Sequence, residues 1–129
     1  MTAKEHWKVE PDDHDYPAAQ DYLSLITDDV SAANLVEELR KAKLVLRKGK
    51  DLLRASRLPL LPEKNLHVAK DLEKVRKGQE LSPVLLVRGN LKAEVPLTVA
   101  DGYHRICASY YLDEDANIPC RIVDYPASK

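Results

Sequence analysis

The sequence has 129 residues, of which 44% are hydrophobic and 32% charged, and its formal net charge at pH 7 is −1. This length and composition are typical of one globular domain with its own core, and they exclude global disorder. We therefore expect a single domain over residues 1–129, with an N-terminal arm and helical extension over 1–50 and a body over 51–124. The near-zero net charge excludes a general attraction to DNA or RNA, so any phosphate-binding surface has to be local.

Positive charge gathers in residues 40–57, where the basic residues are Arg40, Lys41, Lys43, Arg47, Lys48, Lys50, Arg54 and Arg57. Such a run is typical of a solvated helix face and loop. The alternative is a surface for nucleic acid or another acidic partner, which would make the protein a non-enzymatic protein- or DNA-interacting module. Residues 5–15 are acidic by contrast.

The two cysteines, Cys107 and Cys120, lie in apolar surroundings and are expected in the core. The sequence shows no signal peptide and no apolar run long enough for a membrane span, which predicts a cytoplasmic protein with reduced thiols and no membrane partner. Isolated cysteines are a poor zinc signature, and His6 and His14 have no recognised metal spacing. No metal site is predicted.

The first fifteen residues are polar and predict an irregular arm, which Trp7 anchors to the body. Helical spacing predicts a helix from Pro17 whose shared face comprises Ala18, Ala19, Tyr22, Leu23 and Ile26. A second helix is predicted over residues 32–46, with Gly49 as its stop.

Short apolar runs broken by prolines predict a strand leading into a loop over residues 51–62. Periodicity then predicts a helix over 66–75 capped by Asn65, strands over 83–87 and 95–100, a helix over 103–112 and a strand over 118–123. The predicted fold is α/β (α+β), with a small mixed sheet of about four strands preceded by an N-terminal helical pair.

The stretch from Val99 to Ala108 reads VADGYHRICA, an apolar strand followed by a glycine and a helix start. It contains the only consecutive His-Arg pair in the sequence, His104-Arg105. Free backbone N–H groups and the positive end of the helix dipole meet at such a point, so an anion can bind there. This stretch predicts a phosphate site.

Three segments in order resemble the ParB/sulfiredoxin superfamily, over about residues 52–124. A helix over 66–77 precedes a Ser-Pro-Val-Leu-Leu-Val strand, residues 101–108 read DGYHRICA at a helix start, and residues 118–123 read IPCRIV. The resemblance implies a ParB/sulfiredoxin-like fold whose glycine-containing box holds the phosphates of a nucleotide.

Within that superfamily, sulfiredoxins bind ATP and repair over-oxidised peroxiredoxins, ParB proteins bind CTP as a clamp switch, and a few relatives are ADP-dependent serine kinases. The resemblance therefore implies ATP or CTP with Mg²⁺ as cofactor, and a nucleotide or phosphorylated small molecule as partner. The site would act as a switch or in phosphoryl transfer, and the sequence leaves open whether there is turnover.

Two departures limit the resemblance. Tyr103 stands where sulfiredoxins have their reactive cysteine, so repair of peroxiredoxins is not expected. The box has one arginine where ParB has several, and the DNA-binding and dimerisation domains of partition proteins have no counterpart after Val123. A complete partition protein is therefore not expected.

The predicted ligand-binding residues at the box are Gly102, Tyr103, His104 and Arg105. Arg105 can grip phosphate oxygens with paired, charge-assisted hydrogen bonds, or it can instead pair with Asp101 or with the acids at 113–115. His104 can donate to phosphate or act as general acid or base, and Gly102 permits close backbone approach. Tyr103 either stacks on a base and lines the pocket or packs in the core.

Asp101 and His104 are the predicted catalytic residues. Asp101 either caps the helix or serves as a Mg²⁺ ligand or base beside a nucleotide. His67 and Lys70, at the start of the preceding helix, are where the resemblance implies a second phosphate contact, and their alternative is a solvated helix end. Ser82 is a weaker candidate.

Overall fold

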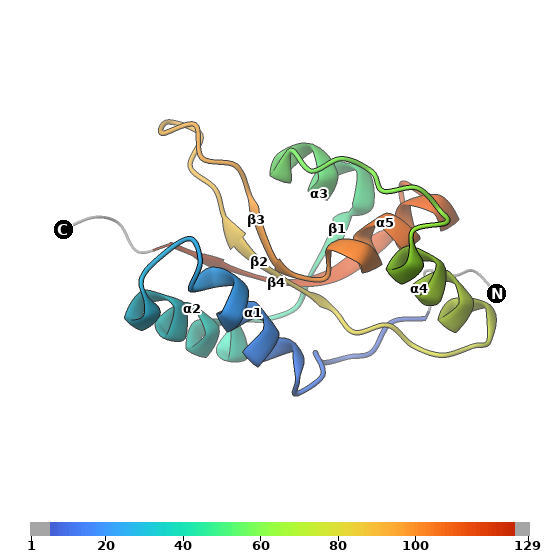
Figure 1. Cartoon of the computed structure of the whole chain (residues 1–129), viewed down its shortest axis with the longest axis horizontal. Helices are drawn as coiled ribbons and strands as arrows, with labels where there is room; N and C mark the ends of the chain where they lie inside the picture. The colour runs from blue at the N-terminus through green and yellow to red at the C-terminus, as the bar shows by residue number, and fades with distance from the viewer. Residues whose placement is uncertain (1–5, 126–129) are drawn as a thin grey trace.

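The computed structural model describes residues 6–125, which form an α/β fold with a four-stranded mixed sheet (Figure 1). Its helices are α1 (Asp15–Leu23), α2 (Asp29–Lys41), α3 (Gly49–Ser56), α4 (Leu66–Arg76) and α5 (Tyr103–Leu112). Its strands are β1 (Val45–Lys48), β2 (Val84–Arg88), β3 (Thr98–Asp101) and β4 (Asn117–Asp124). The sheet order is β1-β4-β2-β3, in which β4 and β2 run parallel and the two outer pairs are antiparallel.

The sheet is covered on both faces, with α1 and α2 on one side and α3, α4 and α5 on the other (Figure 1). Alternate residues of β2 enter the two cores: Leu85 and Val87 pack with α1 and α2, and Val84 and Leu86 pack with α3, α4 and α5. A central strand buried on both faces needs an unbroken apolar run, which is what the sequence shows there. The expected packing of the N-terminal helical pair against the α/β body is seen in the first of these cores.

The buried face of α1 differs from the predicted one. The helix begins at Asp15, and it buries residues at spacings of three and four: Tyr16, Ala19 and Leu23. The predicted face was wrong at three of its five positions, because Ala18 and Tyr22 point to solvent and Ile26 lies beyond the helix end. With this face buried, Asp15 at the N-terminus of α1 is also buried and contacts Ser82 in the loop before β2.

Residues 42–56 also differ from the prediction. The helix α2 ends at Lys41, and Leu46, predicted on its apolar face, lies instead on the edge strand β1 with 58% of its surface exposed. Gly49 begins α3 rather than ending a helix, and the strand predicted over 51–62 is wrong because α3 occupies 49–56. Pairing of β1 with the distant β4 overrides the local helical spacing here.

The elements from α4 onward confirm the prediction closely. Asn65 caps α4, since its Oδ1 accepts the backbone N–H groups of His67 at 3.0 Å and Val68 at 3.2 Å. The helix α5 spans the predicted residues, β2 and β4 lie within one residue of the predicted bounds, and β3 is shorter, at 98–101. Both cysteines are buried and free, and burial raises the pKa of Cys120 to about 12.

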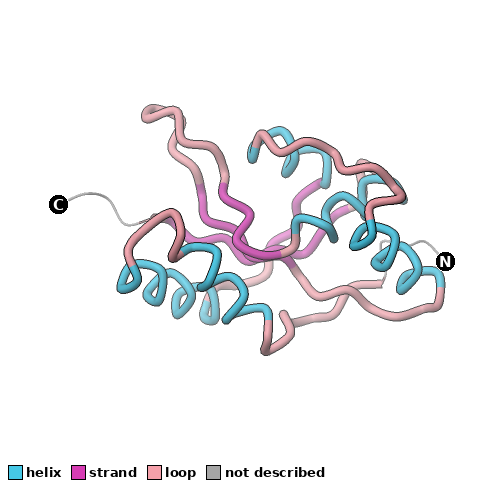
Figure 2. Tube along the Cα trace, in the orientation of Figure 1, coloured by secondary structure: helices cyan, strands magenta, loops and turns pink. Residues whose placement is uncertain are grey.

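The N-terminal arm lies beside the segment that enters β2, and both are drawn as loops in Figure 2. The Lys8 N–H donates to the Leu81 carbonyl at 2.8 Å, and the Leu81 N–H donates to the His6 carbonyl at 2.9 Å. Trp7 packs against the core beneath α4 and α5, so the anchoring role predicted for it is confirmed.

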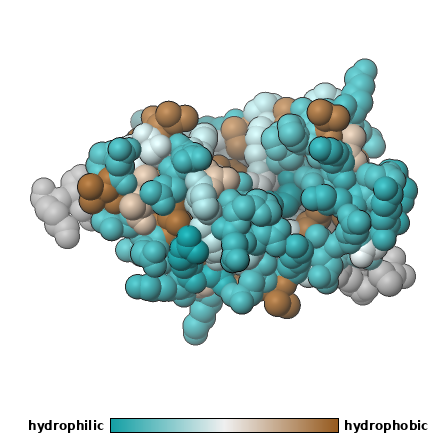
Figure 3. Space-filling model, turned by 60° about the horizontal axis from the view of Figure 1, so that its bottom comes forward, coloured by the Kyte–Doolittle hydropathy of each residue, from teal (hydrophilic) through white to brown (hydrophobic). Residues whose placement is uncertain are grey.

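The surface in Figure 3 is mostly hydrophilic, with separate hydrophobic spots. The exposed large apolar side chains around the α1–α2 turn are Tyr22, Leu25, Ile26 and Val30. Within residues 6–125, no helix has the length and apolar character that crossing a membrane requires.

Arg121 links the helical pair to the middle of the sheet. It lies on β4 with 7% of its surface exposed, and its Nη1 donates to the carbonyls of Arg40 at 2.6 Å and Leu39 at 3.2 Å. The same nitrogen lies 3.1 Å from the Tyr16 hydroxyl, and Nη2 donates to Glu10 at 3.0 Å. A guanidinium thus satisfies the last carbonyls of α2, at the negative end of the helix dipole.

Replacing Arg121 with methionine should lower the free energy of unfolding by about 3 kcal/mol, because buried carbonyls at the end of α2 lose their donor. Urea unfolding followed by circular dichroism measures the loss. The control is Arg76→Met, since Arg76 lies on the surface of α4, where Glu73 is its one ion-pair partner among residues 6–125, and should change stability by less than about 0.5 kcal/mol. Equal losses in the two variants would contradict the role given to Arg121.

Candidate functional site

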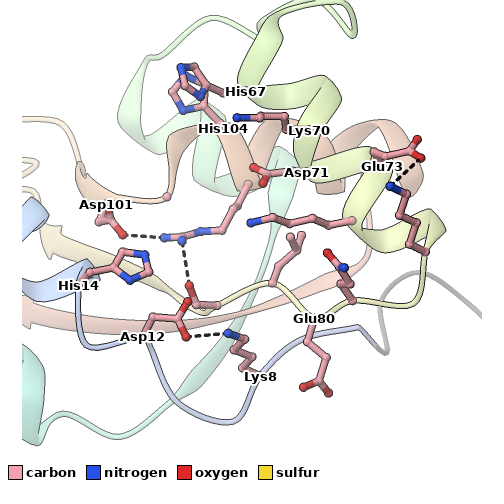
Figure 4. Close-up of a pocket in the computed structure, with 17 residues that line it drawn as sticks. Lys8, Asp12, His14, His67, Lys70, Asp71, Glu73, Glu80, Asp101 and His104 are labelled. Carbon is pink, nitrogen blue, oxygen red and sulfur yellow. Dashed lines mark hydrogen bonds and ion pairs between the residues drawn. The ribbon is translucent and has the colours of Figure 1, made fainter.

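A hollow of about 530 Å³ lies where the start of α5 faces α4 and the N-terminal arm. Four segments line it: the arm, α4, the loop before β2 and the β3–α5 junction. Figure 4 shows Lys8 and Asp12 of the arm on one side and Lys70 and Asp71 of α4 on the other. The predicted residues Asp101, Gly102, His104, Arg105, His67, Lys70 and Ser82 all line this hollow.

Gly102 forms the sharp turn from β3 into α5. Its φ of 111° lies in the region that L side chains avoid, and it is the N-cap residue of α5. A Cβ there would lie 2.8 Å from Arg105 Nη2 and would overlap Val84. No side chain caps α5, so its first backbone N–H groups lack a side-chain acceptor.

Arg105 is held by a polar network rather than extended into solvent. Its Nη2 donates to Asp101 Oδ2 at 2.7 Å, and its Nη1 donates to Ser82 Oγ at 2.9 Å and lies 3.6 Å from Asp15 Oδ1. Ser82 Oγ in turn donates to Asp15 Oδ2 at 2.7 Å. The Arg105 side chain is 15% exposed, and its buried Nε has no hydrogen-bond partner among residues 6–125. Arg105 thus pairs with Asp101, as one of its two predicted roles required, and this pair lies in the wall of the hollow.

Asp101 does not cap α5, because its carboxylate is turned toward Arg105. Burial raises the pKa of Asp101, the Arg105 guanidinium opposes this shift, and the neighbouring Asp15 carboxylate adds to it. Two carboxylates thus share one guanidinium in the wall of the hollow.

The rings of His104 on α5 and His67 on α4 lie against each other, with centroids 4.6 Å apart and planes tilted by 41° (Figure 4). Burial lowers the pKa of His104, and the positive charges of His67 and Arg105 lower it further, whereas Asp71 opposes the shift. Burial also raises the pKa of Asp71 itself. The lowered pKa favours the neutral imidazole of His104, a form that donates one hydrogen bond.

Among the four ligand-binding residues predicted at the box, Tyr103 is the one that does not line the hollow. Its hydroxyl donates to the carbonyl of Pro59 at 2.5 Å, and its ring packs with the core formed by α3, α4 and α5. Of the two roles predicted for Tyr103, the structure places the side chain in the packing position.

Sequence reasoning missed four lining residues, Lys8, Asp12 and His14 of the arm and Lys74 of α4. It also missed Asp15, the first residue of α1, which contacts Ser82 and Arg105 behind the lining. No local signal marks Asp15, because its partners Ser82 and Arg105 are 67 and 90 residues away and α1 was predicted to begin only at Pro17. The acidic composition of the arm was the one available hint.

One possible metal-ligand atom from each of Asp12, His14 and Asp15 lies within 4.8 Å of the other two, a spacing that could hold a metal ion. Their oxygens already have partners, however. Asp12 Oδ1 accepts from Lys8 Nζ at 2.7 Å, which lowers the pKa of Asp12, and Asp15 Oδ2 accepts from Ser82. The group thus works as a hydrogen-bonded lining, and no metal is assigned to it.

No family model, curated protein or solved structure matches the chain. The ParB/sulfiredoxin resemblance therefore stays a prediction from three short segments. The α/β architecture does not depend on this resemblance, because the helices, the strands and the sheet order establish it directly.

Gly102→Ala should lower the free energy of unfolding by about 2 kcal/mol or more, because the new Cβ combines an unfavourable φ with overlap against Val84. Gly78→Ala is the matched control, since Gly78 has a φ of 79° but nothing within 4 Å of the new Cβ, and should cost only about 1 kcal/mol. Urea midpoints compare the two, and a larger loss for Gly78→Ala would contradict the close approach at Gly102.

The His104 ring should titrate below its ordinary pKa of 6.5, as measured from the imidazole carbon-bound protons by NMR. Asp71→Asn should lower that pKa further, because it removes the negative charge that favours the imidazolium, and His67→Asn should raise it. Since the folded protein resists protonating His104, this residue makes stability fall as pH drops below 6.5. Shifts of the same sign in both variants would refute this electrostatic account.

Proposed function

We propose that the protein binds a nucleotide or another phosphorylated small molecule in this hollow, with a phosphate at the N-terminus of α5. The observation that carries the proposal is that α5 begins without a side-chain cap and opens into a cavity rimmed by lysines. Its free N–H groups and the helix dipole favour an anion there. A volume of 530 Å³ lies within the range typical of small-ligand sites.

The unpaired cations of the hollow support a phosphate ligand. Lys8 is paired with Asp12, and Lys77 with Glu73, but Lys70 and Lys74 have no ion pair among residues 6–125. Both project from α4 into the lining, and neutral His104 adds a hydrogen-bond donor. The lining also carries carboxylates, which suits a ligand that arrives with Mg²⁺ more than a bare anion.

Arg105 makes the site a switch in this proposal. A phosphate that reaches its guanidinium competes with Asp101 and Ser82, so binding exchanges one set of contacts for another. The freed Asp101 carboxylate then becomes available as a Mg²⁺ ligand, or as a base if a phosphoryl group is transferred. The binding switch and the phosphoryl transfer use the same residues, and only the second of them converts the nucleotide to product.

The test is thermal unfolding with ATP, ADP, CTP and GTP, each with and without Mg²⁺. A bound nucleotide should raise the unfolding midpoint, since a ligand that binds only the folded state stabilises it by mass action. The variant Lys70→Ala with Lys74→Ala should weaken binding by about tenfold or more, because two charge-assisted contacts are lost. Arg105 is not mutated in this test, because it also pairs with Asp101 and Asp15, and its loss would disturb the structure of the site.

The matched control is Lys41→Ala with Lys43→Ala, which removes the same charge from two exposed lysines outside the hollow. It should leave the nucleotide effect unchanged. Absence of a midpoint shift with every nucleotide, or equal weakening in both double variants, would overturn the proposal.

A further inference from the structure

A second hollow, of about 640 Å³, lies at the other end of the sheet and shares no lining residue with the first. One wall is α3, and the other is the loop of residues 89–97 that joins β2 to β3. Figure 1 shows this loop and α3 projecting from the same side of the sheet. The Leu97 N–H donates to the Ala55 carbonyl at 2.9 Å, which joins the two walls. We call this hollow the arginine groove.

Four arginines line the arginine groove, Arg47, Arg54, Arg57 and Arg88, against two carboxylates, Asp51 and Glu94. Arg88 is paired with Asp124 at 2.8 Å, and Arg47 donates to the carbonyl of Leu46. The side chains of Arg54 and Arg57, both exposed, have no ion pair or hydrogen bond within residues 6–125. The groove therefore carries uncompensated positive charge.

Most of the remaining lining is aliphatic. Leu52, Leu97 and Ile122 contribute to it, and the loop adds Leu91 and Val95, with 96% and 51% of their surfaces exposed. An exposed apolar patch rimmed by charged residues is typical of an interaction surface.

The backbone of the groove is also unusual. Arg57, with φ of 60°, and Glu94, with φ of 59°, are the non-glycine residues with positive φ in the described part of the chain, and both line it. At Arg57 the left-handed conformation ends α3, as is common at helix C-termini, and at Glu94 it lies in a turn of the loop.

The fold divides the basic run of residues 40–57 among different surroundings. Arg40 lies over the ring of Tyr16, at 4.3 Å from its centroid, and Lys50 pairs with Asp115 at 2.6 Å. The run is therefore not one continuous patch, and its arginines 47, 54 and 57 are the part that reaches the groove.

We propose that the arginine groove binds an acidic segment of a partner protein, with aliphatic side chains between its carboxylates. Arginine pairs with carboxylates through two parallel hydrogen bonds, and the aliphatic lining accepts apolar side chains. Single-stranded nucleic acid is the weaker fit, because the lining contains no aromatic ring on which bases stack. This surface is separate from the phosphate site and does not depend on it.

The experiment selects from a phage-displayed library of random peptides on the immobilised full-length protein. Selected peptides should be enriched in Asp and Glu beside Leu, Ile or Val. A synthetic selected peptide should bind at least about tenfold more weakly to Arg54→Ala with Arg57→Asn, measured by fluorescence anisotropy. Asn is chosen at 57 because it tolerates the left-handed backbone.

The matched control is again Lys41→Ala with Lys43→Ala, which loses equal charge outside the groove and should bind the peptide as the unmodified protein does. Leu91→Ser, at a fully exposed position, should weaken binding without loss of stability. The proposal is overturned if no peptide is selected, if acidic residues are not enriched, or if both double variants lose equally. Displacement of the peptide by single-stranded oligothymidylate would assign the groove to nucleic acid instead.

Discussion

The positive charge of Arg105 has to be compensated where it lies, since only 15% of its side chain reaches solvent. One carboxylate, that of Asp101 at the end of β3, accepts directly from the guanidinium, and the other, that of Asp15 at the start of α1, is linked to it through Ser82. The helical pair is therefore joined directly to the wall of the site through Asp15. A buried charge with an incomplete set of partners would cost several kcal/mol, which fixes how the arm, β3 and α5 meet.

Arg121 makes a second link of the same kind at the other end of the helical pair. Arg105 contacts the start of α1, while Arg121 contacts the end of α2. The two arginines thus hold the two ends of the largely apolar contact between the helical pair and the sheet. The Nε of each is buried and has no hydrogen-bond partner among residues 6–125. Burial of apolar surface supplies most of the stability, and these polar contacts determine one orientation of the pair on the sheet.

The sequence predicted the elements whose signals are local. Asn65 before an amphipathic run, the apolar run of β2, and Gly102 before α5 each specify their structure within a few residues. The elements predicted from the sequence were wrong over 42–56, because β1 forms by pairing with β4, which lies some seventy residues later in the chain. At the site the sequence predicted the β3–α5 junction and the α4 contacts, but not Asp15, whose role depends on packing that no spacing rule reveals.

The contact between Tyr16 and Arg121 spans 105 residues, and it bears on the order in which the protein folds during synthesis. The helices α1 and α2 are synthesised before the three strands that they pack against, and Arg121, the cation at the end of α2, follows Leu39 by 82 residues. A helical pair of this length is marginal alone, and its apolar face is fully covered only once β2, β3 and β4 have all been made. A partly made chain that exposes such a face is prone to aggregation, which is the hazard that chaperones counter.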